Sequence, residues 1–334
     1  MKSNFDFLNR YWPALAQIGA TAETYVYSDP NACIYKLGMF AERLVQEILV
    51  FEHIAEPTID NNHANRIRIL KRAGLLPHEI DNTLYVLRKT RNSAVHTGAD
   101  SVDEAKTLLS MTYNLAVWFM ETYGDWGYIA PEFIMPVETA HENLESVIAE
   151  QEKKIAELTK QLAVVTTAAS DKTQKERAKR SESVSAMMNW NEAQTRCLID
   201  EQLRLSGWEA DTQNLRYSKG TRPVKRRNIA ISEWPTNSAF SKNGYADYAF
   251  FVGEKLVALM DAKKMSEDVA STIDVQVKDY AAHIKPEDIP HTVGNWNGYQ
   301  VPFLFASNGR AYLEQLRTKS GIWFLDVREQ ENQP

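Results

Sequence analysis

Residues 244–263 read GYADYAFFVGEKLVALMDAK and contain two strand-like runs, each with an acidic residue at one end. Asp247 opens the first run, and Asp261 ends the second run two positions before Lys263. The stretch Leu256–Met260 is continuously apolar, which is typical of a strand buried on both faces. An acid and a lysine at the end of such a strand are costly to bury unless they meet a partner or a metal ion.

Residues two apart in a strand point to the same side of the sheet, so Asp261 and Lys263 are expected to face one site. If the neighbouring strand brings Asp247 alongside, two carboxylates and one ammonium group converge. Two carboxylates hold a hard Mg²⁺ ion through oxygen. The ion lowers the pKa of a bound water and neutralises charge on a phosphate, while Lys263 orients that water or contacts the phosphate. A surface salt bridge at a strand end is the alternative interpretation.

The surrounding sequence predicts a small α/β domain. In chain order, the expected elements are a helix at 191–205, strands at 228–234, 247–252 and 256–261, a helix at about 271–283 and a strand at 302–306. Gly207 marks the end of the first helix, because glycine commonly ends helices. Helices and strands in this order pack in layers, which indicates an α/β sandwich.

The pattern of Asp247 and Asp261–Lys263 resembles the PD-(D/E)xK signature of nucleases, with Ala246 in place of the proline. The segment Gln276–Tyr280 resembles the Q-x-x-x-Y element of the RecB-like branch of these nucleases. The resemblance implies a restriction-endonuclease-like α/β core in which both end residues of that segment support the site. Their four-residue spacing places them on one helical face, so capping of that face is the alternative.

The same resemblance implies a third acid on the helix before the strands, and Glu192 at the start of that helix is the best match. The implied metal ligands are Asp247, Asp261 and Glu192, and the implied catalytic set adds Lys263, Gln276 and Tyr280. As an alternative, Glu192 complements the helix dipole at the N-terminus. Arg196 and Asp200 follow on the same face and are candidates to brace the site.

A basic cluster precedes the first expected strand and consists of Lys219, Arg222, Lys225, Arg226 and Arg227. Lysine and arginine side chains contact DNA mainly at its phosphates. Beside a nuclease core, the cluster is therefore a candidate DNA-binding surface. A solvated loop without a binding role is the alternative.

Residues 1–136 are predicted to form a helical domain of about five helices, because glycine is sparse and apolar residues recur at three- and four-residue steps. Residues 137–186 differ, since apolar residues at heptad-like spacing are followed by a polar, basic stretch. We expect a coiled-coil or linker helix there, which either dimerises or packs against the bundle as an arm. Residues 187–330 then form the nuclease domain.

A second motif lies at the end of a helical run in the first domain. Arg91, Asn92 and His96 resemble the R-x-x-x-x-H element of HEPN domains. The resemblance implies a HEPN-like fold for residues 1–136. In active members of that family, the arginine and histidine serve phosphate stabilisation and proton transfer in RNA cleavage. Ordinary packing at a helix end is the alternative.

Several stretches together resemble the N-terminal portion of the restriction (R) subunit of type I restriction–modification enzymes. They are 195–200, 206–208, 229–235, 245–248, 261–264 and 305–310. Many members of that family have Glu-Ala-Lys where this chain has Asp261-Ala262-Lys263, and the signature tolerates either acid. The resemblance implies an endonuclease that cuts double-stranded DNA with Mg²⁺ and assembles with methyltransferase (M) and specificity (S) subunits.

A complete R subunit also carries an ATP-driven DNA translocase. This chain has no G-x-x-x-x-G-K-[ST] phosphate loop, so ATP is expected to bind only a longer subunit of which the chain is a fragment. A stand-alone nuclease is the alternative. Two other functions stay open: a non-catalytic module that docks the R subunit on the methyltransferase core, and a HEPN-type RNase.

The bulk composition is that of an ordinary soluble protein, with 44% hydrophobic and 25% charged residues. No apolar run reaches the roughly 20 residues that a membrane span needs, and no signal-peptide pattern is present, so no membrane contact is expected. Cys33 and Cys197 fit no metal or disulfide spacing and are expected to be buried thiols in a reducing cytoplasm. The net charge of −6 does not exclude DNA binding, since a local basic surface suffices.

Overall fold

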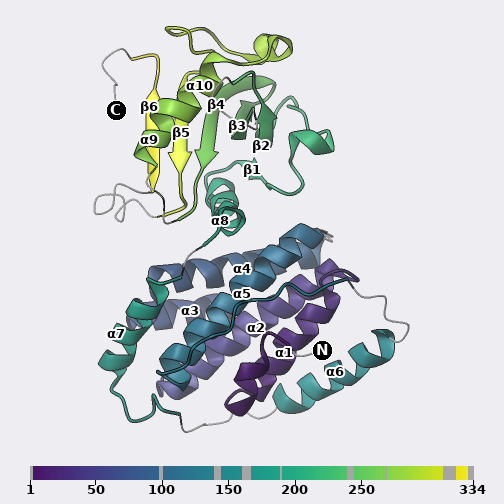
Figure 1. Cartoon of the computed structure of the whole chain (residues 1–334), viewed down its shortest axis with the longest axis vertical. Helices are drawn as coiled ribbons and strands as arrows, with labels where there is room; N and C mark the ends of the chain where they lie inside the picture. The colour runs from purple at the N-terminus through teal and green to yellow at the C-terminus, as the bar shows by residue number, and fades with distance from the viewer. Residues whose placement is uncertain are drawn as a thin grey trace. The chain divides into compact units, whose positions relative to one another are not determined.

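A computed structural model of the chain describes residues 3–97, 101–138, 144–159, 167–188, 190–238, 244–265, 267, 269–310 and 321–329. Within these ranges, the side chains at 93, 95–97, 144–148 and 159 lie outside the description. The chain divides into two compact units, residues 1–188 and 189–334, and each is considered by itself (Figure 1).

The first unit is built of α-helices (Figure 1). Its elements are the 3-10 turn η1 (Asp6–Arg10), α1 (Pro13–Tyr25), α2 (Pro30–Phe51), α3 (His63–Arg72), α4 (His78–Thr97), α5 (Val102–Phe119), the π-helical turn η2 (Met120–Gly124), α6 (Leu144–Thr159) and α7 (Gln174–Ser185). Helices α1 to α5 lie within the segment for which about five helices are predicted. In the described part of the chain, no helix combines the length and the apolarity that crossing a bilayer requires.

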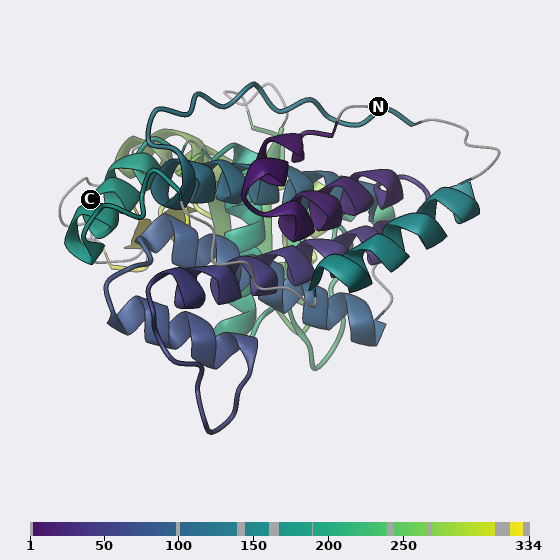
Figure 2. The same ribbon diagram turned by 90° about the horizontal axis from the view of Figure 1, so that it is seen from below.

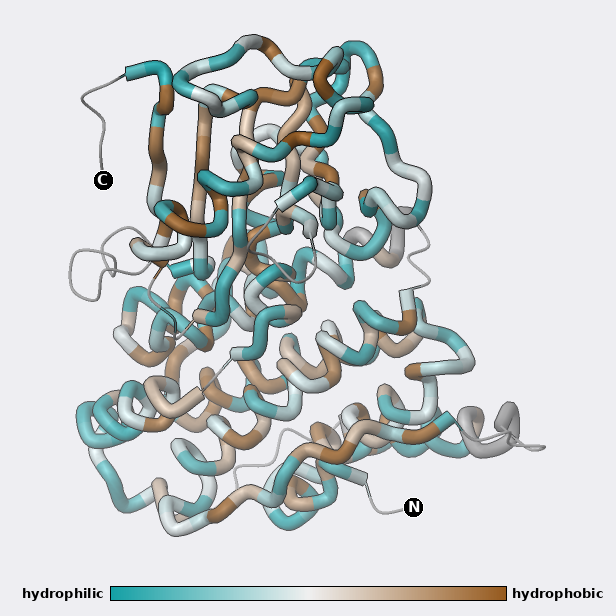
Figure 3. Tube along the Cα trace, turned by 45° about the horizontal axis from the view of Figure 1, so that its top comes forward, coloured by the Kyte–Doolittle hydropathy of each residue, from teal (hydrophilic) through white to brown (hydrophobic). Residues whose placement is uncertain are grey.

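Helix α2 forms the centre of this unit, and α1, α4 and α5 pack around it. The side chain of Asp29 accepts a 2.9 Å hydrogen bond from the backbone N–H of Ala32, and Pro30 occupies the first helical position. The buried residues of the helix recur at three- and four-residue steps and include Cys33, Leu37, Phe40, Leu44 and Ile48. Figure 3 shows the same alternation of hydrophobic and hydrophilic segments along the helices of this unit.

An extended strap, residues 125–138, follows η2 and runs along the helices of the first unit (Figures 1 and 2). The backbone N–H of Ile134 donates to Oδ1 of Asn4 over 2.9 Å. The hydroxyl of Tyr27 donates to the carbonyl of Pro136 over 2.7 Å. These contacts satisfy backbone groups of the strap and fix it to the N-terminal helices.

Helices α6 and α7 arise from the segment 137–186, and both pack within the first unit. Helix α6 lies against α1 with Ile155 buried, as expected for an arm folded on the bundle. Leu162, one of the apolar residues at heptad-like spacing in this segment, lies outside the described residues. Helix α7 packs against η2, and Arg177 near its start donates to both carboxylate oxygens of Glu52, with Nε 2.7 Å from Oε1. Because this ion pair is buried, removing one partner leaves an uncompensated charge, which costs about 3–5 kcal/mol.

The second unit contains a mixed six-stranded sheet (Figure 1). Its elements are α8 (Glu192–Leu205), β1 (Glu209–Ala210), η3 (Tyr217–Lys219), β2 (Asn228–Pro235), β3 (Tyr245–Val252), β4 (Lys255–Ala262), α9 (Ala270–Thr272), the π-helical turn η4 (Ile273–Val277), α10 (Lys278–Ala282), η5 (Pro286–His291), β5 (Phe303–Ser307) and β6 (Ile322–Asp326). The strands lie in chain order from β1 to β6. β1–β2 and β4–β5 pair in parallel, and the other neighbours pair antiparallel.

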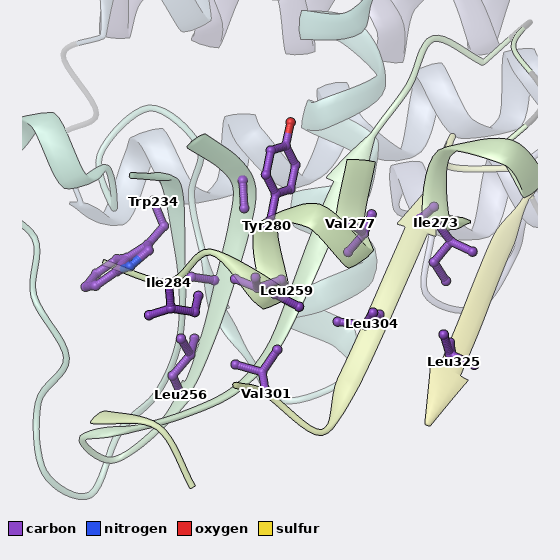
Figure 4. Close-up of a cluster of buried hydrophobic side chains, with 14 of the residues drawn as sticks. Trp234, Leu256, Leu259, Ile273, Val277, Tyr280, Ile284, Val301, Leu304 and Leu325 are labelled. Atoms are coloured by element: carbon purple, nitrogen blue, oxygen red, sulfur yellow. The ribbon is translucent and has the colours of Figure 1, made fainter. Parts of the chain in front are cut away.

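Two apolar clusters cover the two faces of this sheet. One combines sheet residues with Val269, Ile273, Val277 and Ala281, so that α9, η4 and α10 cover this face (Figure 4). The other includes Ile199, and therefore α8 covers the opposite face. This is the α/β layer arrangement that the order of elements predicts. Strands β1 and β6 belong to the same sheet but are not among the strands that the sequence predicts.

Candidate active site

Two acidic side chains face each other on adjacent strands. The register pairs Tyr248 of β3 with Met260 of β4, so Asp247 lies opposite Asp261. The backbone N–H of Ala262 donates to Oδ2 of Asp247 over 2.7 Å and links the strands at this level. Both acids are buried, with exposed fractions of 5% and 3%. Register therefore brings together the two carboxyl groups that the sequence predicts to converge.

The charge of Asp247 is balanced by an arginine side chain on α8. Nη2 of Arg196, on α8, donates to Oδ1 of Asp247. Burial raises the pKa of Asp247 to about 7, an effect that Arg196 opposes and the neighbouring Asp261 reinforces. Two carboxyl groups held this close favour either a proton or a further cation between them.

Lys263 lies on the same side as Asp261, two positions further along the chain. Its Nζ is 2.7 Å from Oδ2 of Asp261, which makes an ion pair between the two side chains. Burial disfavours the charge of Lys263, but Asp261, Asp247 and Glu192 together raise its pKa above the ordinary value. The lysine is therefore a charged ammonium group. Its position directly after β4 keeps it beside the two carboxyl groups.

Glu192 reaches the same group of charges from the first turn of α8. The helix begins there because the side chain of Asn191 accepts from the backbone N–H of Gln194, whose side chain accepts from the backbone of Asn191 in return. Oε1 of Glu192 lies 2.7 Å from Nη2 of Arg196, and 48% of the glutamate side chain is exposed. Arg196 thus stands between two of the three acids predicted to bind metal.

Glu233 on β2 is an acid of this site that the sequence analysis did not single out. Ser232 pairs with Tyr248 and Trp234 with Ala246, so Glu233 lies level with Asp247. Its φ of 53° falls in the left-handed region, which is unusual for a residue with a side chain. Its carboxylate lies 3.8 Å from Nη1 of Arg196 and 3.4 Å from Nη2 of Arg216.

The backbone turn at Glu233 interrupts the alternation of side chains along β2. Ile231 and Trp234 belong to the same apolar cluster although they are three positions apart, whereas a regular strand would place them on opposite faces. Ala246 and Ala249 show the same break on β3, on either side of Asp247. A regular strand would aim Glu233 at the apolar cluster, so the break explains why it meets Arg196 on the α8 side.

A buried polar network holds α8 in place beside these acids. Tyr248 lies with its hydroxyl 2.9 Å from Oδ1 of Asp200 on α8 and 2.8 Å from the hydroxyl of Thr212. Thr212 also donates its backbone N–H to Asp200 over 2.8 Å, and Ser232 donates to the Thr212 carbonyl over 3.0 Å. Burial raises the pKa of Asp200 to about 6, and the hydrogen bonds from Thr212 oppose that rise. The network fixes α8 one turn after Arg196.

Gln276 and Tyr280 lie in η4 and α10, which cover the sheet face opposite to α8. Gln276 falls in the π-helical turn η4, so the two residues are separated by a local change of helical period. Tyr280 is 4% exposed and belongs to the apolar cluster. Figure 4 shows its hydroxyl turned away from the aliphatic side chains. Oε1 of Gln276 is buried and has no hydrogen-bond partner among the described residues.

The five basic residues before β2 are all exposed. Arg227 pairs with Glu209, with Nε 2.9 Å from Oε1, and Arg222 stacks 3.7 Å over the ring of Tyr217. Lys225 lies 3.9 Å from Glu254. Within the described ranges, Lys219 and Arg226 have no acidic partner. The cluster is thus partly neutralised within the chain.

The HEPN-like motif lies on α4 of the first unit. Nη1 of Arg91 is 2.7 Å from Oε2 of Glu42, and its guanidinium lies 5.0 Å from the centre of the Tyr35 ring. Asn92 is exposed, and the side chain of His96 lies outside the described residues. The contacts of Arg91 are those of a residue that ties α4 to α2.

No metal cluster of three acidic, histidine or cysteine side chains is assembled in the described part of the chain. Both oxygens of Asp247 accept hydrogen bonds, one from Arg196 and the other from the Ala262 backbone. The donor chemistry nevertheless fits a hard divalent cation, because two buried carboxyl groups lie opposite each other. Oδ2 of Asp261 also accepts no regular hydrogen bond from the described residues. In the structure, Arg196 occupies Oδ1 of Asp247, so the carboxyl pair has the donor chemistry for such a cation but not two free carboxylates.

Comparison with known proteins covers both units. Residues 209–334 match the family model of the second domain of the type I restriction enzyme EcoKI endonuclease subunit. Residues 20–161 match a domain of unknown function, DUF4145. No solved structure gives a significant match.

The whole-chain comparison gives the same assignment. The chain is 28% identical to the type I restriction enzyme EcoKI endonuclease subunit of Escherichia coli (strain K12), over an alignment that includes 99% of this chain. It spans about a third, 34%, of the length of that relative. By both comparisons, the chain is similar to the N-terminal part of the R subunits of type I restriction enzymes.

Proposed function

We propose that this chain is the DNA-cleaving part of a type I restriction R subunit and hydrolyses phosphodiester bonds of double-stranded DNA with Mg²⁺. One observation carries the proposal: Asp247 and Asp261 lie opposite each other at buried positions, with the ammonium group of Lys263 beside them. The similarity to a type I restriction endonuclease subunit supports this assignment. We propose that the reaction takes place in the cytoplasm, where such an enzyme meets DNA.

The proposed metal ligands are Asp247, Asp261 and Glu192. A bound Mg²⁺ supplies a water of lowered pKa and neutralises charge on the scissile phosphate. Lys263 contributes a fixed positive charge 2.7 Å from Asp261, suited to contact a phosphate oxygen or to orient the water. We assign Gln276 and Tyr280 supporting roles in a PD-(D/E)xK, RecB-like core. Oε1 of Gln276 is buried and has no hydrogen-bond partner among the described residues, which favours a contact that forms only when metal and DNA are bound.

The basic cluster is proposed to contact DNA phosphates through its exposed side chains, which are Lys219, Arg222, Lys225, Arg226 and Arg227. The DNA specificity and methylation functions are assigned to separate S and M subunits. ATP is assigned to a motor in a longer R subunit, since this sequence contains no phosphate loop.

The first unit is proposed to be a HEPN-like docking module for the methyltransferase core, and not an RNase. The observation that counts against an RNase role is the engagement of Arg91 by Glu42 and Tyr35. A guanidinium held in this way contributes to the packing of α4 on α2.

The test is cleavage of plasmid DNA by the full chain in Mg²⁺, with Asp261→Asn and Lys263→Met variants. Each substitution is expected to lower the cleavage rate by about 100-fold or more, equivalent to roughly 3 kcal/mol of lost transition-state stabilisation. Asp274→Asn is the matched control, because Asp274 is an acid outside the site, paired with Lys278. Metal-dependent cleavage that survives in both site variants would refute the assignment.

A further inference from the structure

Arg196 occupies the place between the acids that the proposed metal ion needs. Its Nη2 contacts two carboxylates at once, Oε1 of Glu192 at 2.7 Å and Oδ1 of Asp247. These acids are two of the three proposed ligands. A guanidinium and a divalent cation compete for the same oxygens, because each is stabilised by the same negative charge.

A second acceptor for the same guanidinium lies on the neighbouring strand. Nη1 of Arg196 is 3.8 Å from Oε1 of Glu233, beyond hydrogen-bond length but close enough for a small rotation to make the contact. The positive φ of 53° at Glu233 turns this carboxylate toward α8. A backbone conformation of this kind is strained for a residue with a side chain, and such conformations cluster at functional sites.

The present contacts of Arg196 leave part of it unsatisfied. The side chain is 11% exposed, and its Nε is buried without a hydrogen-bond partner among the described residues. An incompletely bonded guanidinium loses less on moving than a fully bonded one. The strong negative environment also keeps it charged, since Asp247 and its neighbours raise the pKa of Arg196 despite burial.

We infer that Arg196 is a built-in competitor of the metal ion, which bridges Glu192 and Asp247 in the metal-free site and moves to Glu233 when a divalent cation binds. One rotation of the guanidinium then frees both carboxylates together. Glu233 is a positioning residue, which accepts the displaced cation and touches neither metal nor DNA. The inference rests on the proposed metal site and adds how that site is kept closed.

The competition has a measurable consequence. The observed affinity for metal is reduced by the fraction of molecules in which Arg196 covers the ligands. Removing Arg196 therefore tightens binding, whereas removing its acceptor Glu233 weakens binding. When Arg196 is absent, removing Glu233 no longer changes the affinity for metal, because there is no guanidinium for Glu233 to accept.

The experiment is isothermal titration of the full chain with Mn²⁺ for wild type, Arg196→Gln, Glu233→Gln and the double variant. We expect the Kd to fall about tenfold in Arg196→Gln and to rise several-fold in Glu233→Gln, with the double variant close to Arg196→Gln. Arg227→Gln is the matched control, because it removes a guanidinium from an ion pair with Glu209 outside the site. If Arg196→Gln fails to fold, Glu233→Gln and Arg196→Lys, which keeps the charge but cannot span both carboxylates, carry the test.

The possible failures are distinguishable. Mn²⁺ that binds wild type and Arg196→Gln with equal Kd, or binds the variant more weakly, overturns the competition and leaves the metal site standing. A Glu233→Gln variant with unchanged Kd removes the acceptor role. No Mn²⁺ binding to wild type or Arg196→Gln overturns both the metal site and the inference. Abolition of binding by Asp261→Asn ties the measured ion to this site.

Discussion

Asp247 and Asp261 are buried on adjacent strands, and each is balanced by a cation from a different element. Arg196 on α8 contacts Asp247, and Lys263 at the end of β4 contacts Asp261. The two cations come from different parts of the fold. Arg196 reaches Asp247 from the covering helix and occupies one of its proposed ligand oxygens, whereas Lys263 lies two positions after Asp261 along the chain. Compensation of the two buried carboxyl charges is thus divided between a cation from α8 and a cation from the end of β4.

The D-x-K spacing predicts that Asp261 and Lys263 share a site, because side chains two apart on a strand face the same way. The role of Glu233 could not be predicted in this way. In a regular strand it would face the apolar cluster with Ile231, and only its positive φ turns it to the α8 side. Such a local backbone reversal has no signature in alternation or composition.

His63 in the first unit gives a prediction about acid stability. It is 7% exposed, and neither ring nitrogen has a hydrogen-bond partner among the described residues. Burial lowers the pKa of His63 from 6.5 to about 4, reinforced by nearby arginines and partly offset by Glu42. Because the folded value lies below the unfolded one, stability is present above about pH 6.5 and is lost as the pH falls toward 4.

Between pH 7 and pH 5, this histidine is expected to reduce the free energy of unfolding by about 2 kcal/mol. Urea denaturation at both pH values, followed by hydrogen exchange in α3, measures that change in the first unit. His63→Gln should flatten the pH dependence, whatever its effect on absolute stability. Equal pH dependence in the two proteins would show that the ring is not held neutral by the fold.

At the scale of elements, the position of α8 determines whether Glu192 and Arg196 reach the strand acids. Tyr248 anchors this helix through Asp200, with Thr212 completing the network. Tyr248→Phe is expected to lower the free energy of unfolding by about 1–3 kcal/mol, because buried polar groups lose a partner. Denaturant unfolding with hydrogen exchange in α8 measures the loss and its location.

Tyr217→Phe is the control for that substitution, since its hydroxyl makes no hydrogen bond within the described part of the chain. A cost below about 0.5 kcal/mol is expected there, as for most substitutions away from buried polar networks. A Tyr248→Phe variant as stable as this control would mean that the network does not hold α8.

The elements that the sequence predicts well are those with a strong local period. The helix expected at 191–205 is α8, Glu192–Leu205, and the strand expected at 256–261 lies within β4, Lys255–Ala262. β1 is two residues long and β6 is an edge strand with Phe324 exposed, so neither has a clear pattern of burial. The π-helical turn at Gln276 is likewise set by packing on the sheet and not by local sequence.

At the scale of the whole molecule, the similarity to a type I restriction endonuclease subunit extends over 99% of the chain and therefore includes both units. The second unit matches a domain of a type I restriction endonuclease subunit, and the first matches a domain of unknown function. We propose that the first unit docks and the second cuts, within a longer subunit that supplies the motor. The chain spans 34% of the length of that relative.

The most direct test of the nuclease site is anomalous diffraction from crystals of the full chain grown with saturating Mn²⁺. We expect an anomalous peak about 2 Å from carboxylate oxygens of both Asp247 and Asp261, as for a small divalent cation bound by oxygen. We also expect that Arg196 has left Asp247 and lies against Glu233. Ordered crystals that show no Mn²⁺ at these carboxylates, with Arg196 still bridging Glu192 and Asp247, would contradict both expectations.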